Sequence, residues 1–212
     1  MGVDLSKYDK KLVPQHPPIA AIEPRRFVSE QDSLLLMQEK RYSYSGDDFD
    51  IKDMRTGRNI FKVDGKLGIS QKKRLLDSNG KCIANLKHNM YGYSVYLGDT
   101  SDTTLFDIKS RTTGSRGSSH IEADLKNILT DETVRLVLLG HERNTEIVIF
   151  KGHPKNGGYA IAKVTRQLTT TIDTYHLAIS SGVEVPIIIF MVIALDEAKS
   201  ERSHSSNRRL RM

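Results

Sequence analysis

The chain has 212 residues, and its 32 Lys and Arg against 26 Asp and Glu give a formal charge of +6 at pH 7. This length is typical of a single domain. The one cysteine, Cys82, excludes an intrachain disulfide framework, a four-ligand zinc module built on cysteines and a CxxC redox pair. Because no apolar segment follows a basic start, we do not expect secretion.

Both ends of the chain differ in composition from its middle. Residues 1–28 hold four of the six prolines and show little periodicity, which predicts a flexible, extended arm. Residues 199–212 are polar and basic, which predicts a disordered tail. We therefore expect one folded domain over 29–198.

The folded domain is built from short runs in which apolar and polar residues alternate. In one of them Ile121, Ala123 and Leu125 alternate with charged residues, as in a strand with one buried face. The pair Asn79-Gly80, between two such runs, is typical of a two-residue hairpin turn. Runs of this kind predict about twelve strands, near 34–37, 48–52, 60–63, 73–76, 82–86, 94–97, 105–108, 121–126, 134–139, 146–150, 160–164 and 174–179. Without helices between them, they favour a mainly β fold, an antiparallel barrel or sandwich.

One segment, 185–195, has no charged or polar residue. Periodicity does not separate a strand from a helix here, but Pro186 favours a helix that begins there, because proline suits a first turn and is costly in a central strand. We expect this helix at about 186–197. Its apolar part measures about 16 Å, short of the roughly 30 Å of bilayer hydrocarbon. A helix that is apolar all round belongs inside protein, and a barrel of about twelve strands is wide enough to enclose it.

Several motifs in the domain follow one another in a familiar order. Residues 45–53 read SGDDFDIKD, 61–65 read FKVDG after a turn, and a basic strand ends in Leu-x-Asp at 75–77. Towards the C-terminus, 175–178 read YHLA, and the apolar run ends in ALDE at 194–197. In this order and spacing the motifs resemble the LURP-one-related family over nearly the whole domain.

The resemblance implies a Tubby C-terminal-like fold, a twelve-stranded closed β-barrel around a hydrophobic C-terminal helix. Relatives of the family include the Tubby domains, which bind phosphoinositides, and the phospholipid scramblases. The chain departs from the family pattern at two places. Residues 183–186 read VEVP where Val-Asp is usual before the helix, and 91–93 read YGY where a Trp often stands in the middle hairpin.

No catalytic motif is present in the sequence, which lacks G-x-S-x-G, H-E-x-x-H, a P-loop and G-x-G-x-x-G. The seven histidines show no metal-ligand spacing. Strand alternation sends Asp47 and Asp48 to opposite faces, which disfavours a calcium site with Asp50 and Asp53. We therefore expect a protein that is not an enzyme and that holds no metal or cofactor.

Phosphate recognition is the chemistry that the sequence favours. Residues 54–74 carry seven basic side chains and one acidic residue, Asp64. If the seven converge on one rim, each contributes about 1 kcal/mol to attraction towards an anionic leaflet. The alternative is a solvated strand face whose charges are balanced by neighbours. The candidate headgroup contacts are Arg55, Arg58, Lys62, Lys66, Lys72, Lys73 and Arg74, with the last three favoured.

The N-terminus adds a second membrane feature. The first six residues, MGVDLS, fit the N-myristoylation pattern M-G-x-x-x-[ST], which makes Gly2 a candidate for lipidation. Lysines at 7, 10 and 11 follow, and a single myristoyl chain needs such a second signal for stable anchoring. The alternative is a chance match, because the pattern is short.

Together these features predict a non-enzymatic, intracellular binding module, monomeric and either cytoplasmic or peripheral at a membrane, that contacts acidic phospholipid headgroups of the phosphoinositide type. The alternative is a signalling or transcription-linked adaptor, nuclear or cytoplasmic, that binds a protein or DNA. Nucleic acid is the less favoured partner, since no DNA-reading module is found. A third interpretation, phospholipid scrambling, requires the apolar helix to leave its barrel. The arm and tail hold ten basic and four acidic residues, so the domain between them has no net charge.

Overall fold

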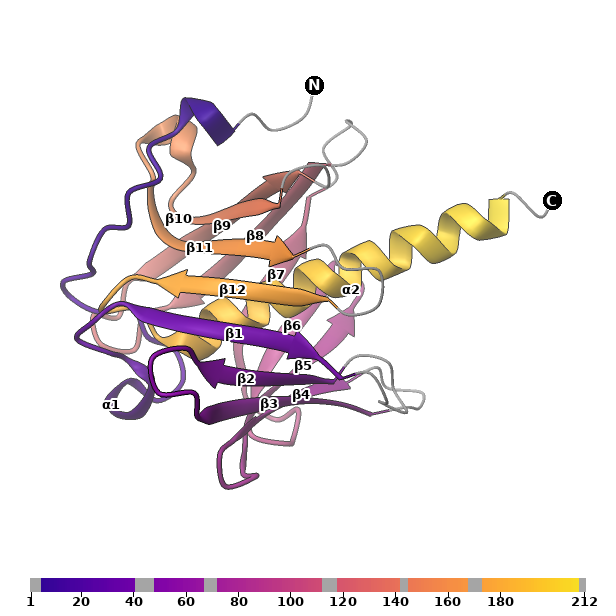
Figure 1. The fold of residues 1–212 in the computed structure, drawn as a ribbon, viewed down its shortest axis with the longest axis horizontal. Helices are drawn as coiled ribbons and strands as arrows, with labels where there is room; N and C mark the ends of the chain where they lie inside the picture. Colours follow the sequence, from indigo (N-terminus) through magenta and orange to yellow (C-terminus); the bar gives the residue numbers. More distant parts are fainter. Residues whose placement is uncertain are drawn as a thin grey trace.

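Residues 5–40, 48–66, 72–111, 118–141, 145–167 and 173–209 are described by a computed structural model. Their strands form a closed barrel in which each strand pairs antiparallel with the next along the chain, and β12 closes the ring by pairing with β1 (Figure 1). The predicted mainly β architecture, a twelve-stranded closed barrel, is confirmed.

The strands are β1 (Ser33–Glu39), β2 (Phe49–Asp53), β3 (Asn59–Lys66), β4 (Lys72–Asp77), β5 (Cys82–Asn89), β6 (Gly92–Leu97), β7 (Thr104–Ser110), β8 (Ser118–Lys126), β9 (Thr133–His141), β10 (Glu146–Lys151), β11 (Tyr159–Gln167) and β12 (Thr174–Ile179). The helical elements are η1 (Leu5–Lys7), α1 (Pro24–Phe27), η2 (Pro154–Asn156) and α2 (Val185–Arg209).

Period-two alternation decides which face of each strand points into the barrel. In β8, Ile121, Ala123 and Leu125 are buried, while the acidic residues between them are partly exposed. The predicted hairpin turn joins β4 to β5, with Gly80 at φ 80°, a left-handed conformation that glycine adopts without steric cost. The apolar face of every strand is therefore available to cover a central element.

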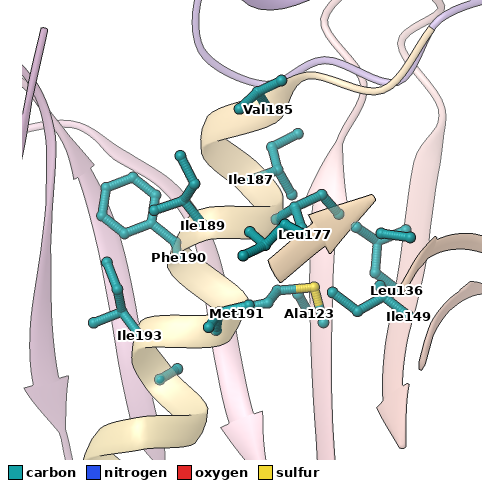
Figure 2. Close-up of a cluster of buried hydrophobic side chains, with 14 of the residues drawn as sticks. Ala123, Leu136, Ile149, Leu177, Val185, Ile187, Ile189, Phe190, Met191 and Ile193 are labelled. Atoms are coloured by element: carbon teal, nitrogen blue, oxygen red, sulfur yellow. The ribbon is translucent and has the colours of Figure 1, made fainter. Parts of the chain in front are cut away.

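That element is α2, whose first part runs inside the barrel (Figure 1). Side chains from Ile187 to Leu195 are at most 2% exposed. Figure 2 shows Ile187, Ile189, Phe190, Met191 and Ile193 pointing from the helix in several directions, with Leu136, Ile149 and Leu177 of the barrel packed alongside. Among the described residues, no helix combines the length and the apolar character needed to cross a bilayer. The predicted enclosure of a hydrophobic helix is confirmed.

The helix is longer than the sequence predicts. It begins at Val185, beside the expected start, but it continues to Arg209, past the expected end at 197 and through most of the tail predicted to be disordered. Starting a helix is the unfavourable step, and each further residue then adds a hydrogen bond. A nucleus held inside the barrel can therefore propagate into the polar sequence that follows.

The described part of the N-terminal arm, residues 5–28, is packed on the barrel and includes the short helices η1 and α1. Ile19 is fully buried and bridges to Val183, while Val28 bridges to Glu184. Leu5 lies in a separate apolar cluster with residues of β9, β10 and β11. The arm thus covers apolar surface at one end and along one side of the barrel.

Replacing Phe190, which is fully buried on the enclosed part of α2, tests the enclosure. We expect Phe190→Ala to lower the free energy of unfolding by about 3–5 kcal/mol, because it removes a large apolar side chain and leaves a cavity. The control is Met90→Ala, since Met90 is 85% exposed and its truncation should cost less than about 0.5 kcal/mol. Urea denaturation measures both, and equal losses would contradict the enclosure.

Candidate functional site

The seven predicted basic residues are divided between the two ends of the barrel. We call the end where α2 begins the entry end, and the end where it emerges the exit end (Figure 1). Arg55 and Arg58 lie on the turn between β2 and β3, at the entry end. Lys66 and Lys72 face one another at the exit end, where β3 finishes and β4 starts. The seven residues therefore do not converge on one rim.

On the outer face of β3 and β4 the basic residues are paired with acids. Arg74 bonds Asp64 and reaches Asp99 at 3.4 Å, and the Lys72 ammonium lies 2.6 Å from Asp99. Lys62 lies 3.7 Å from Asp64. The side chain of Lys66 is outside the described part of the structure. This surface matches the alternative interpretation, a strand face whose charges are balanced by neighbours.

Lys73 points the other way, into the barrel. It shares the inner face of β4 with Leu75, and its ammonium lies 3.0 Å from the Glu197 carboxylate of α2. Only 7% of the Lys73 side chain and 16% of the Glu197 side chain are exposed. A membrane headgroup has no access to a lysine in this position, so the structure assigns Lys73 to the fastening of α2.

A second polar contact fastens α2 at the same level. The hydroxyl of Tyr175, a fully buried residue of β12, lies 2.6 Å from a carboxylate oxygen of Asp196. Burial raises the pKa of Tyr175 and that of Asp196. At the exit end, Lys73 and Tyr175 of the barrel wall thus provide partners for the carboxylates of Glu197 and Asp196 of α2.

The exit end also carries the most exposed apolar side chains. Met90 and Tyr91, at the tip of the turn between β5 and β6, are 85% and 76% exposed, the highest values among the described large hydrophobic residues. The last part of α2 emerges from the barrel on this side (Figure 1), and the sequence from residue 199 holds five basic residues and one acidic residue. The sequence held a signal for the exposed tip, two apolar residues at a hairpin turn, but the alternation of strands does not reveal it.

The entry end is held by Glu184, which the sequence marked only as a departure from a family pattern. Its buried carboxylate accepts hydrogen bonds from the backbone N–H groups of Ala21, Ile22 and Glu23, at 2.7, 2.9 and 2.5 Å. Burial raises the pKa of Glu184, and the three N–H donors oppose that rise. One carboxylate thereby ties the arm to the start of α2.

Beside this clamp lies a surface pocket of about 480 Å³, lined by residues of α1, the β2–β3 turn, the end of β4 and Val185. Arg58 is the one predicted site residue in its lining, and Arg26, which the sequence interpretation did not select, is another. The lining places these two arginines and the carboxylates of Asp53 and Asp77 beside a partly apolar surface, and Arg26 is bonded to Asp77.

Two further predictions concern Gly2 and metal ions. Gly2 lies outside the described residues, so its lipidation stays a prediction. The part of the chain that the structure describes contains no cluster of three or more His, Cys, Asp or Glu suited to a metal. Asp53 instead accepts from the backbone N–H groups of Arg55 and Thr56, both at 2.8 Å, and the bond from Thr56 lowers the pKa of Asp53. Its role is to close the β2–β3 turn.

Comparisons with known proteins agree with this architecture. A family model described as LURP-one-related matches residues 33–196. A crystal structure of a protein from Arabidopsis thaliana superposes with a TM-score of 0.63 at 20% identity, covering 85% of this chain and 98% of that one. No curated protein matches. At this identity the structural likeness establishes the fold alone.

Removing the Glu184 carboxylate should leave three buried backbone N–H groups without an acceptor. Because each such group costs about 1–3 kcal/mol, we expect Glu184→Ala to lower the free energy of unfolding by about 3 kcal/mol or more. Glu184→Gln keeps an acceptor oxygen and should cost less. Glu23→Ala, which truncates an exposed side chain nearby, serves as the control. A loss from Glu184→Ala no larger than that of the control in urea denaturation would refute the clamp.

The inward position of Lys73 predicts a defect in stability rather than in surface binding. Lys73→Glu places two carboxylates together and should cost about 3–5 kcal/mol, as when one partner of a buried pair is lost. The double variant Lys73→Glu with Glu197→Lys restores opposite charges and should recover much of that loss. Thermal and urea denaturation give both values. If Lys73→Glu has the same free energy of unfolding as the wild type, the inward position of Lys73 is wrong.

Proposed function

The chain belongs to the LURP-one-related family, and we propose that it is a non-enzymatic binding protein that attaches to acidic phospholipid surfaces, including those rich in phosphoinositides, by its exit end. The observation that carries the proposal is that an exposed apolar tip and a basic segment lie close to the same end of the barrel. The exposed Met90-Tyr91 tip and the basic stretch from residue 199 lie at the same end of the barrel (Figure 1).

The exposed tip supplies the apolar part of such an attachment. Tyrosine is enriched at membrane–water interfaces, where its ring contacts acyl chains and its hydroxyl stays hydrated. Tyr91 and Met90 are exposed in the barrel itself, so burying them in a bilayer needs no rearrangement of the barrel core. Two side chains alone give weak attachment, and a second attractive term is required.

The basic C-terminal stretch supplies that second term. Each Lys or Arg near an anionic leaflet contributes about 1 kcal/mol, and residues 199–212 hold five of them against one acid. Attraction of this kind is screened by salt, so binding should weaken as ionic strength rises.

Sedimentation with phosphatidylcholine vesicles, with and without phosphatidylinositol bisphosphate, tests the proposal. We expect binding only to the acidic vesicles, and a loss of about 30-fold or more in affinity for Arg202→Glu with Arg208→Glu, since losing two attractive charges of about 1 kcal/mol each already costs that much and the new charges are repulsive. Met90→Ser with Tyr91→Ser should also weaken binding while leaving the free energy of unfolding unchanged.

The matched control reverses two charges at the other end. Arg25→Glu with Arg55→Glu alters the net charge equally, and both residues are exposed at the entry end. This variant should bind the acidic vesicles within about twofold of the wild type, because its substitutions lie farther from the leaflet than the Debye length. Equal losses in the control and in the tail variant would show attraction by net charge alone and would refute the exit end as the binding surface.

A further inference from the structure

The pocket at the entry end has an apolar wall. Phe27 of α1 and Phe61 of β3 pack against each other with tilted rings whose centroids lie 5.6 Å apart, and these largely buried side chains line the pocket together with Ile60 and Val185. The Arg26 guanidinium lies over the Phe27 ring, 4.9 Å from its centroid. The volume of about 480 Å³ lies within the range of small-molecule sites. A ring or short alkyl chain finds apolar contact here.

Two carboxylates at the pocket are already engaged by the protein. Asp53 accepts from the backbone N–H groups of its own turn. Asp77, which is 6% exposed, accepts from the N–H groups of Asn79 and Lys81, both at 2.9 Å, and from the Arg26 guanidinium. These bonds fix both acids in place and occupy the guanidinium of Arg26.

Arg58 differs from Arg26 in having no such partner. It is exposed on the pocket rim, and among the described residues no hydrogen bond or ion pair involves its guanidinium. A free guanidinium binds a carboxylate through two parallel N–H···O bonds. Arg58 is the one cation of the described lining that is not already engaged, so it can neutralise one negative charge of a ligand, and a second would meet the Asp53 and Asp77 carboxylates without a partner.

We propose that this pocket is a binding site for a small monoanionic carboxylate with an aromatic or short alkyl body, its carboxylate on Arg58 and its body on Phe27, Ile60 and Phe61. The site is separate from the exit end and does not rest on membrane attachment. Because its lining joins α1, β3 and the first residue of α2, a bound ligand stabilises the folded chain and raises its melting temperature.

Three aromatic probes that differ only in charge test the proposal on the full chain. Naphthoate has one negative charge, naphthamide has none, and naphthyl phosphate approaches two. We expect saturable binding of naphthoate by calorimetry, with a rise in melting temperature, and binding at least about tenfold weaker for the other two probes. Equal affinity for naphthamide, or no saturable binding of naphthoate, would overturn the proposal.

Three variants locate the site. Arg58→Gln should weaken naphthoate binding by about tenfold, and Ser78→Trp, which adds bulk at an exposed rim position, should also weaken it. Arg55→Gln changes an exposed arginine on the same turn that is not in the lining and should bind like the wild type. If Arg58→Gln keeps wild-type affinity, Arg58 is not the anion contact and the proposal fails. Vesicle binding of Arg58→Gln should equal that of the wild type, so the two proposals stand or fall separately.

Discussion

A helix that is apolar on every side has to be removed from water, and the fold of this protein follows from that requirement. The first part of α2 exposes at most 2% of any side chain from Ile187 to Leu195. A single sheet or one neighbouring helix covers only one side of such a helix, whereas a closed barrel covers all of them. Every strand must then turn an apolar face inwards. In the part of the chain that the structure describes, the charged groups of α2 that are buried with it lie near the places where the helix enters and leaves the barrel.

Charged and polar side chains are buried at both ends of the barrel, and at each end specific hydrogen-bond or ion-pair partners stabilise them. At the entry end, the Glu184 carboxylate accepts three backbone N–H groups of the arm. It also lies just before the N-terminus of α2, where the helix dipole favours a negative charge. At the exit end, Lys73 meets Glu197, and Tyr175 meets Asp196. Charged residues that resemble binding residues in a sequence are, at these positions, part of the fastening of the helix.

The fold was predictable from the sequence because two independent patterns agree. Alternation located the strands, and the uninterrupted apolar run at 185–195 required an enclosure. The partners of the basic residues were less accessible. Asp99, which pairs with Lys72 and Arg74, is 25 or more residues away along the chain and is brought near by the meander of strands. The sequence does indicate that Lys73 points inwards, because Lys73 and Leu75 lie on the same face of β4. The basic residues on either side of Lys73, however, make the whole segment resemble a surface patch. Composition does not predict the length of α2, because the polar residues from 199 onwards are equally typical of a disordered tail, whereas a helix already nucleated in the barrel extends at little cost.

The two ends of the barrel differ in which basic side chains are already paired with carboxylates, and the number of basic residues in the sequence does not show this difference. Residues 54–74 contain seven basic side chains, and this count suggests one strong anion-binding patch. In the folded chain, however, Lys72, Lys73 and Arg74 are each engaged by a carboxylate. Arg58, at the opposite end of the same hairpin, keeps its guanidinium open to a ligand beside an apolar wall. Among the described lining residues of the pocket, Arg58 is the cation left for a ligand, and one cation beside an apolar wall would discriminate by shape and charge. The basic stretch from residue 199 would attract any anionic surface and would lose that attraction in salt. The two proposals therefore assign selectivity to the entry end and adhesion to the exit end.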